Sequence, residues 1–413
     1  MTSEVCLMNS LSVVLAADSA TTVEYYGDKG PERRYFKGAN KIFQLSEQHP
    51  VGLMIYHSAS LLGVPWEVTI KEFRKELENK SFNEVVGFSD EFISFIQSNQ
   101  RFFPDEVRKK SFCQATLSTA VAQALRIGEA KQSEPDPQDI LTDFLSGEVA
   151  LDDVPLDEDE IDDLWQVTKH DVLEANMLLH KYFGEPDEDT MERVARRAFD
   201  LHLAGHDTDN GYTGLVFAGF GDHSVFPELV TFGRCKFVGT KFVAGDRKVE
   251  KVTHDIPAVM SAFAQTSMTD TFALGLSFDV FAKMQTIFAE ELKLIADGIA
   301  EANGGVPIEE DILEMVRERL NSSKTKLFRY TESDHSLPLR RVLGVLPVDE
   351  MAELAETLIN LQSLKEKVTK PSETVGGPVD VAAITRSEGL VWIKRKHYFS
   401  SELNSRFFDR RRD

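Results

Sequence analysis

The stretch Val13-Val-Leu-Ala-Ala-Asp-Ser-Ala-Thr-Thr22 decides the fold of this chain. Its apolar first half ends in the carboxylate of Asp18, and a second short apolar run, Val5 to Met8, precedes it across the turn pair Asn9-Ser10. Two apolar runs on either side of such a pair predict a β-hairpin. We therefore expect the chain to begin with two paired strands, the second of which presents a carboxylate at its end.

The rest of the chain alternates between blocks of strands and blocks of helices. Short apolar runs predict strands, whereas apolar residues at helical spacing predict helices. Strands are expected at 41–45, 51–56, 213–220, 228–232, 236–242, 248–254, 379–384 and 390–393, and helices at 64–77, 91–97, 106–128, 160–183, 189–203, 277–301, 309–320 and 348–368. Separated strand clusters with helices between them favour an α+β layered fold over a doubly wound parallel sheet. We expect a four-layer α-β-β-α sandwich with a large helical insertion.

The expected elements divide the chain into four parts. Residues 1–69 are the N-terminal half of the sandwich, 70–210 a mostly helical insertion, 211–399 the C-terminal half, and 400–413 a basic tail. The insertion contains an acidic run, 152–163, with eight Asp or Glu among its twelve residues. Such a run is typical of an exposed, solvated loop.

Composition and charge exclude several classes of function. The chain has 413 residues and a formal net charge of −22, which argues against nucleic acid and anionic membranes as partners. No apolar run reaches the roughly 18 residues that span a bilayer. Its three cysteines show no CxxC spacing, which indicates neither a disulfide framework nor a zinc ribbon and fits a reducing compartment. With no signal-peptide pattern at the N-terminus, we expect a cytoplasmic protein.

Thr2 is a candidate nucleophile at the start of the chain. Removal of Met1 is sterically easy before a small residue, and it would leave Thr2 with a free α-amino group. The reference pKa of such an amine is about 7.7–8.0. It is therefore a built-in general base on the same residue as the hydroxyl that it must activate. Asp18 supplies a carboxylate, and Lys41, just before an expected strand, supplies a cation.

These residues match a known pattern. The segment Val13–Thr22 resembles the VVLAAD-S-x-AT segment of proteasome β-subunits and their bacterial relatives, which are N-terminal-nucleophile hydrolases. In that family the nucleophile and the Asp are separated by the same 16 positions as Thr2 and Asp18 here. The family's lysine stands immediately before a short strand, as Lys41 does, with Lys37 as the alternative if the longer loop shifts the alignment.

The resemblance implies a role for each residue. Thr2 would supply the attacking Oγ and the α-amine base, Lys41 would lower the effective pKa of the hydroxyl, and Asp18 would orient and neutralise Lys41. It implies a threonine protease that cleaves peptides or other amides through an acyl-enzyme, uses no metal or organic cofactor, and forms homo-oligomers. The segments 375–384 and 213–221 resemble, respectively, the family's Ser-Gly-Gly turn and its second-sheet hairpin.

The chain also departs from the family pattern. His57-Ser58 stands where the family has a Gly-Gly pair whose backbone N–H is the oxyanion donor. The family's supporting Asp aligns near Ser372, and the Ser of its turn aligns with Val375. A further supporting Ser aligns near Ser267 or Met268. The expected Thr–Asp–Lys set is complete, whereas the residues around it are altered.

A second hypothesis therefore stands beside the hydrolase. The chain would be a catalytically inactive assembly or partner-binding protein that uses its helical insertion. On that reading Thr2 is a terminal residue, Asp18 closes a turn and Lys41 is a solvated charge. A metal site at His202 and His206, with Asp207 and Asp209, is disfavoured because the pattern lacks the Glu of HExxH.

Overall fold

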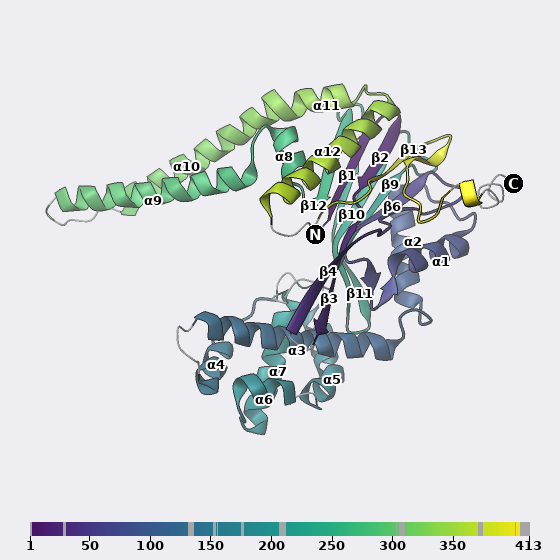
Figure 1. Ribbon diagram of the computed structural model, residues 1–413. Coiled ribbons are helices and arrows are strands. Elements are labelled where there is room, and N and C mark those ends of the chain that lie inside the picture. Colours follow the sequence, from purple (N-terminus) through teal and green to yellow (C-terminus); the bar gives the residue numbers. More distant parts are fainter. Residues whose placement is uncertain are drawn as a thin grey trace.

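The fold is taken from a computed structural model, which describes residues 2–27, 30–130, 136–151, 154, 156–174, 177–205, 212–302, 304, 310–370, 375–400 and 402–404. Within these residues, two five-stranded antiparallel sheets form the centre of the molecule (Figure 1). The strands are β1 (Ser3–Asn9), β2 (Ser12–Ala17), β3 (Ala20–Gly27), β4 (Gly30–Lys37), β5 (Ile42–Gln44), β6 (Val51–His57), β7 (Ser60–Leu61), β8 (Val64–Pro65), β9 (Thr213–Gly219), β10 (Glu228–Val238), β11 (Lys241–Lys251), β12 (Ala258–Ala264), β13 (Asp380–Thr385) and β14 (Gly389–Lys394).

The helices are α1 (Trp66–Leu77), α2 (Val85–Ser98), α3 (Asp105–Ala130), α4 (Pro137–Phe144), α5 (Glu158–Glu174), α6 (Met177–Phe183), α7 (Glu188–Leu203), α8 (Ser267–Leu274), α9 (Phe278–Ala302), α10 (Glu310–Thr331), α11 (Leu337–Leu343) and α12 (Val348–Thr369). The first sheet has the order β12-β1-β2-β13-β14, and the second has the order β11-β10-β9-β6-β5. Antiparallel sheets combined with helices confirm the predicted α+β class.

The apolar run at the end of the first hairpin is explained by burial on both faces of β2. Val13, Leu15 and Ala17 belong to a buried cluster shared with residues of the second sheet. Val14 and Ala16 point the other way and belong to a cluster shared with α12. Since side chains alternate between the faces of a strand, a strand buried on both faces is apolar throughout.

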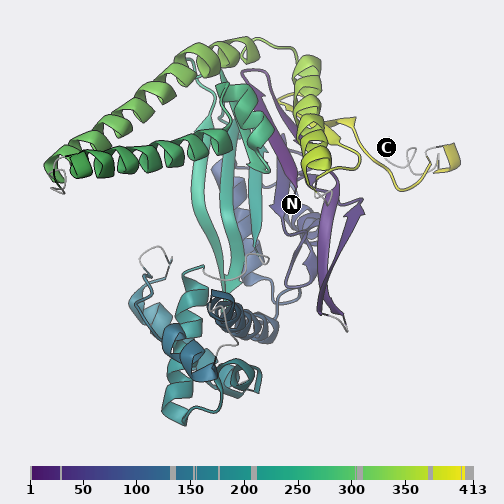
Figure 2. The same ribbon diagram turned by 60° about the vertical axis from the view of Figure 1, so that its left-hand side comes forward.

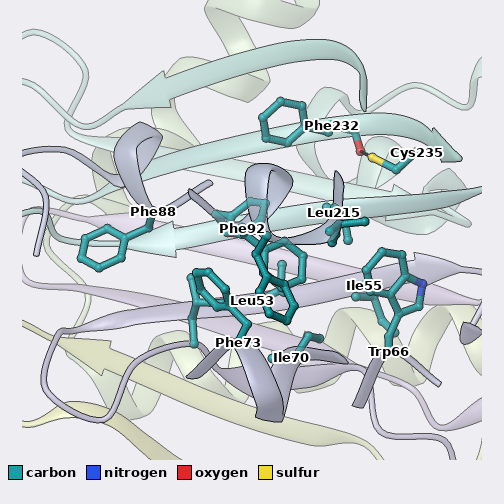
Figure 3. Close-up of a cluster of buried hydrophobic side chains, with 14 of the residues drawn as sticks. Leu53, Ile55, Trp66, Ile70, Phe73, Phe88, Phe92, Leu215, Phe232 and Cys235 are labelled. Atoms are coloured by element: carbon teal, nitrogen blue, oxygen red, sulfur yellow. Dashed lines mark hydrogen bonds between the residues drawn. The ribbon is translucent and has the colours of Figure 1, made fainter. Parts of the chain in front are cut away.

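Helices pack on the outer faces of both sheets. A third cluster joins α1 and α2 to the second sheet through large aromatic side chains such as Trp66, Phe73 and Phe92 (Figure 3). On the first sheet, Leu358 and Ile359 of α12 fill the same role. These contacts hold the two sheets in a fixed position relative to each other. The strand ends that carry the candidate residues are therefore held in place as well.

Two helical parts extend beyond the sheets. Helices α3 to α7 surround a buried cluster of their own, which reaches the sheet at Val238 and Val243 (Figure 1). Helices α9 and α10 form a long arm that projects away from the sheets in both views (Figures 1 and 2). Among the described residues no single helix is long and apolar enough to cross a membrane, although α8 and α9, bent by 79° at their junction, reach the length and composition together.

The structure differs from the expected elements at several points. The charged, Gly-rich sequence after residue 20 forms the hairpin β3–β4, and β12 fills a place where no strand was expected. The three strands expected between 228 and 254 are two long strands, β10 and β11, with shifts of register between Phe232 and Lys236. Local bulges of this kind break a periodic pattern without ending the strand. Helices α1 and α2 pack on the second sheet, although the expected insertion begins at residue 70.

Candidate active site

Asp18 lies directly after β2 and is almost completely buried. Its Oδ1 accepts a hydrogen bond from Ser3 N at 3.1 Å, and its Oδ2 accepts from Ala20 N at 3.2 Å and Gly376 N at 2.8 Å. Lys41 Nζ donates a short hydrogen bond to Oδ1. Three backbone N–H groups and an ammonium therefore fix this carboxylate in place.

Lys41 stands immediately before β5, as the sequence predicts, and is 5% exposed. Its backbone carbonyl accepts from Ile55 N at 2.9 Å, which ties the residue to β6. Its ammonium lies between two carboxylates, that of Asp18 and that of Glu4, whose Oε1 is 3.1 Å away. The alternative, Lys37, is exposed at the end of β4 and lies outside this buried group.

Thr2 is 3% exposed, and its Oγ1 donates a hydrogen bond to Glu4 Oε2 at 3.2 Å. Its backbone carbonyl accepts from Gln265 N at 2.9 Å, which fixes the residue beside the end of β12. The structure therefore brings Thr2, Asp18 and Lys41 together at the strand ends on one side of the two sheets. Glu4 links the hydroxyl of Thr2 to the ammonium of Lys41.

Glu4 is the site residue that the sequence reasoning missed. It is the second residue of β1, next to the apolar run Val5–Met8, and is completely buried. Burial raises its pKa from 4.5 to about 7; Lys41 opposes this rise, while Asp18 adds to it. A charged residue in an otherwise apolar buried strand was the signal available in the sequence, since such residues are almost never buried without a partner.

A small cavity lies beside Thr2. It is lined by Thr2, Lys41, residues 20, 21 and 39, and the segment Ile55–Ala59. A larger hollow, lined by Glu228, His223 and neighbouring residues, lies at the opposite end of the second sheet and contains none of the predicted residues. We place the candidate site at the smaller cavity because the buried polar group is there.

One wall of this cavity is the His57-Ser58 segment. His57 has a φ of 67°, a left-handed conformation that is uncommon for residues other than glycine. His57 therefore has a backbone conformation that glycine adopts more readily than a residue with a side chain. Ser58 N donates to the carbonyl of Tyr212 at 3.2 Å, so this N–H already has an acceptor.

The Gly376-Gly377 turn braces the site from the far end of the chain. Besides the bond from Gly376 N to Asp18, the carbonyl of Gly376 accepts from Ser19 N at 3.2 Å. Gly376 and Gly377 have φ values of 146° and 84°, which side-chain-bearing residues rarely adopt. Ser372 lies outside the described residues, whereas Val375 is buried at the start of the turn.

The remaining candidates lie elsewhere. Ser267 begins α8, where its Oγ donates to Gln362 Oε1 at 3.2 Å and accepts from Lys365 Nζ at 3.1 Å, and Met268 N donates to the same Gln362 oxygen. His202 is buried in α7 against Phe112, and residues 206 to 211 lie outside the described part. Within the described residues no group of three or more His, Cys, Asp or Glu is placed to hold a metal ion.

A glycine next to the cavity offers a test of its packing. A Cβ on Gly214 would lie 1.8 Å from Cζ of Tyr56, so we expect Gly214→Ala to displace the ring and lower the free energy of unfolding by about 1–3 kcal/mol. Urea denaturation measures this loss. Gly233→Ala is the matched control, because nothing lies within 4 Å of its added Cβ. Equal losses in the two variants would contradict the packing of Tyr56 described here.

Comparison with known proteins adds the following. No protein-family model and no curated protein matches the chain. Three solved structures are similar at 10% identity: an Anbu (Gly-1) mutant from Hyphomicrobium sp. strain MC1 (TM-score 0.28), Anbu (ancestral beta-subunit) from Yersinia bercovieri (0.29) and a helical assembly of the Anbu complex from Pseudomonas aeruginosa (0.30). The matches cover 100%, 98% and 100% of this chain and 95%, 93% and 94% of the others, in the same order.

These matches correct the resemblance drawn from the sequence. Anbu is a family distinct from the proteasome β-subunits, so assigning the chain to the proteasome β-subunit-like N-terminal-nucleophile hydrolases is wrong. The assignment relied mainly on Val13–Thr22, which covers β2, the carboxylate after it and the start of β3, and does not specify a family. Since the TM-scores lie below 0.5, the function proposed below rests on the geometry of the site.

Proposed function

We propose that the protein is a threonine hydrolase that cleaves amide bonds, most simply those of peptides, through an acyl-enzyme on Thr2. The observation that supports this is the buried network in which the Thr2 hydroxyl, Glu4, Lys41 and Asp18 are joined beside a cavity. Buried charges are costly, and a linked set of them next to a hydroxyl is typical of an active site.

The proposed chemistry follows from these contacts. Thr2 Oγ1 attacks the carbonyl carbon of the amide while its proton passes to a neighbouring base. The ammonium of Lys41 stabilises the negative charge that develops on Thr2 Oγ1. Asp18, which is fixed by three backbone N–H groups, holds Lys41 in position. The amine leaves with the proton, and water then hydrolyses the ester on Thr2. This chemistry requires no metal or organic cofactor.

Intact mass analysis tests the proposal. The native protein should lack Met1, so that Thr2 is its first residue, and a peptide boronate should add to the Thr2 hydroxyl. Peptide mapping after labelling locates the adduct. Retention of Met1 on the native protein, or an adduct at another residue, would contradict a mechanism through an N-terminal Thr2.

One observation favours a second candidate function. The N–H of Ser58, at the wall where an oxyanion donor was expected, is bonded to the carbonyl of Tyr212. This favours a catalytically inactive assembly or partner-binding protein that uses its helical insertion. In that case Thr2→Ala leaves function intact, whereas removal of α3 to α7 abolishes it. Labelling of Thr2 by the boronate would count against this candidate.

We further propose that the chain forms a homo-oligomer through α9 and α10. The arm exposes a series of large apolar side chains, a feature of interaction surfaces: Phe278, Val280, Ile287, Phe288, Leu294, Ile295 and Ile299 on α9, and Ile312, Met315, Phe328 and Tyr330 on α10. The double variant Phe288→Asp/Ile295→Asp should shift the assembly toward monomers in light scattering after size-exclusion chromatography. Val225→Asp, which changes an exposed apolar residue away from the arm, should leave the mass unchanged.

We also propose how the sheets and helices are layered and how the chain is divided into parts. The helices on the outer faces and the cluster between the sheets support a four-layer α-β-β-α sandwich. We propose that its halves are 1–69 and 211–399, with a helical insertion at 70–210 centred on α3 to α7 and a basic tail at 400–413. The three cysteines are free and buried, which supports a cytoplasmic location.

A further inference from the structure

Glu4 occupies a position that the fold would otherwise fill with an apolar side chain. It lies on the same face of β1 as Cys6 and Met8, which point into the cluster between the two sheets. Its neighbours across the ladder are Ala17 and Phe263. A carboxylate here gives no packing advantage, so its presence calls for a chemical explanation.

The charges around Glu4 do not balance. Lys41, before β5, is the cation that Glu4 and Asp18 share among the described residues. Lys41 forms a short hydrogen bond with Asp18, whereas Glu4 Oε1 lies 3.1 Å from Nζ without hydrogen-bond geometry. Burial raises the pKa of Tyr56 on β6 to about 12, and the neighbouring Glu4 adds to the rise. Lys41 therefore pairs mainly with Asp18, and Glu4 is left as the carboxylate that can gain or lose a proton.

The other carboxylate oxygen of Glu4, Oε2, faces the Thr2 hydroxyl. Oε2 accepts the hydrogen bond of Thr2 Oγ1 at 3.2 Å, close to the distance over which a general base takes a proton. Burial raises the pKa of Glu4 to about 7, which suits a base that works near neutral pH.

We propose that Glu4 is a catalytic residue of the hydrolase, the base that takes the proton from Thr2 Oγ1. The proposal rests on the function proposed above and replaces the α-amine of Thr2 in that role. As Oγ1 bonds to the carbonyl carbon, its proton moves to Glu4 Oε2. When the C–N bond breaks, Glu4 gives this proton to the departing nitrogen. In the second half-reaction Glu4 takes a proton from the attacking water and returns it to Thr2 Oγ1 as the ester bond breaks.

The pH profile of Glu4→Gln, with a fluorogenic peptide library as substrate, tests this role. In the native protein kcat/KM should rise with pH through about 7, because only the Glu4 carboxylate can accept the proton. Glu4→Gln should lose about 10²–10⁴-fold in kcat/KM and lose this rise. Glu228→Gln is the matched control: this buried glutamate at the other end of the sheet bonds to Val85 N, and its variant should keep both rate and profile.

The outcomes separate the two proposals. If boronate labels Thr2 but Glu4→Gln keeps the native rate and the same rise with pH, Glu4 is not the base, while the hydrolase stands. If neither turnover nor labelling of Thr2 occurs in the native protein, the hydrolase and the role of Glu4 both fail. Should Glu4→Gln not fold, infrared titration of the native protein replaces it. A carboxyl band that titrates near pH 7 and shifts when boronate adds to Thr2 supports the proposal, and the absence of such a band overturns it.

Discussion

Thr2→Ala is expected to abolish the proposed hydrolysis, with a fall in kcat/KM of about 10³-fold or more, because among the described residues Thr2 Oγ1 is the hydroxyl that donates to Glu4, the partner of Lys41. The fold should survive, since the Thr2 carbonyl keeps its bond from Gln265 N. Turnover of the peptide library and boronate labelling measure the loss, and circular dichroism checks the fold.

Thr2→Ser is the control for this variant. It keeps a hydroxyl on the same residue and should therefore keep measurable turnover and labelling. A Thr2→Ala protein that hydrolyses the library at the native rate would show that the reaction takes place elsewhere in the molecule.

Lys41→Met should produce the largest loss of stability. It leaves the buried carboxylates of Glu4 and Asp18 without the cation between them. Breaking a buried ion pair from one side costs about 3–5 kcal/mol, because the remaining charge is uncompensated. Urea denaturation near pH 7.5 measures the change in the free energy of unfolding.

The pH dependence of this loss has a defined sign. The pKa of Glu4 in the folded protein is raised from 4.5 to about 7, so its contribution to stability is present below pH 4.5 and is lost as the pH rises through 7. Lys41 lowers the pKa of Glu4, and Lys41→Met removes this effect. The loss of unfolding free energy in Lys41→Met should therefore be smallest near pH 5 and grow toward pH 8. The double variant Lys41→Met/Glu4→Gln should recover part of it. A loss of unfolding free energy that stays constant from pH 5 to pH 8 would contradict the pairing of Lys41 with both Glu4 and Asp18.

The sequence predicted most of the central elements because their patterns follow from burial. The hairpin of β1 and β2 reads as apolar runs since both strands are covered on both faces. The β3–β4 hairpin is not predicted from the sequence, because the exposed side chains at the end of β4 do not alternate between apolar and polar residues. The sequence predicts three strands where the structure has two, β10 and β11, because a bulge interrupts the alternation of side chains along the strand.

Part of the candidate site could be predicted because two of its charges stand next to buried apolar runs. Asp18 and Lys41 stand at strand ends, where a charge after or before an apolar run is visible in the sequence. Glu4 lies within a strand, and its role depends on Lys41, which arrives from the other sheet. Such a contact depends on how the two sheets pack, which a linear pattern does not show.

The place of β13 in the first sheet has a consequence for how the protein is made. β13 lies between β2 and β14, and Gly376 N bonds to Asp18 across 358 residues of chain. During synthesis, which proceeds from the N-terminus, β2 cannot pair with β13 until residues 380–385 have left the ribosome. We expect the carboxylate of Asp18 to receive its full set of donors only then. A chain released before residue 376 would thus carry Thr2 beside an Asp18 that lacks the donor from Gly376.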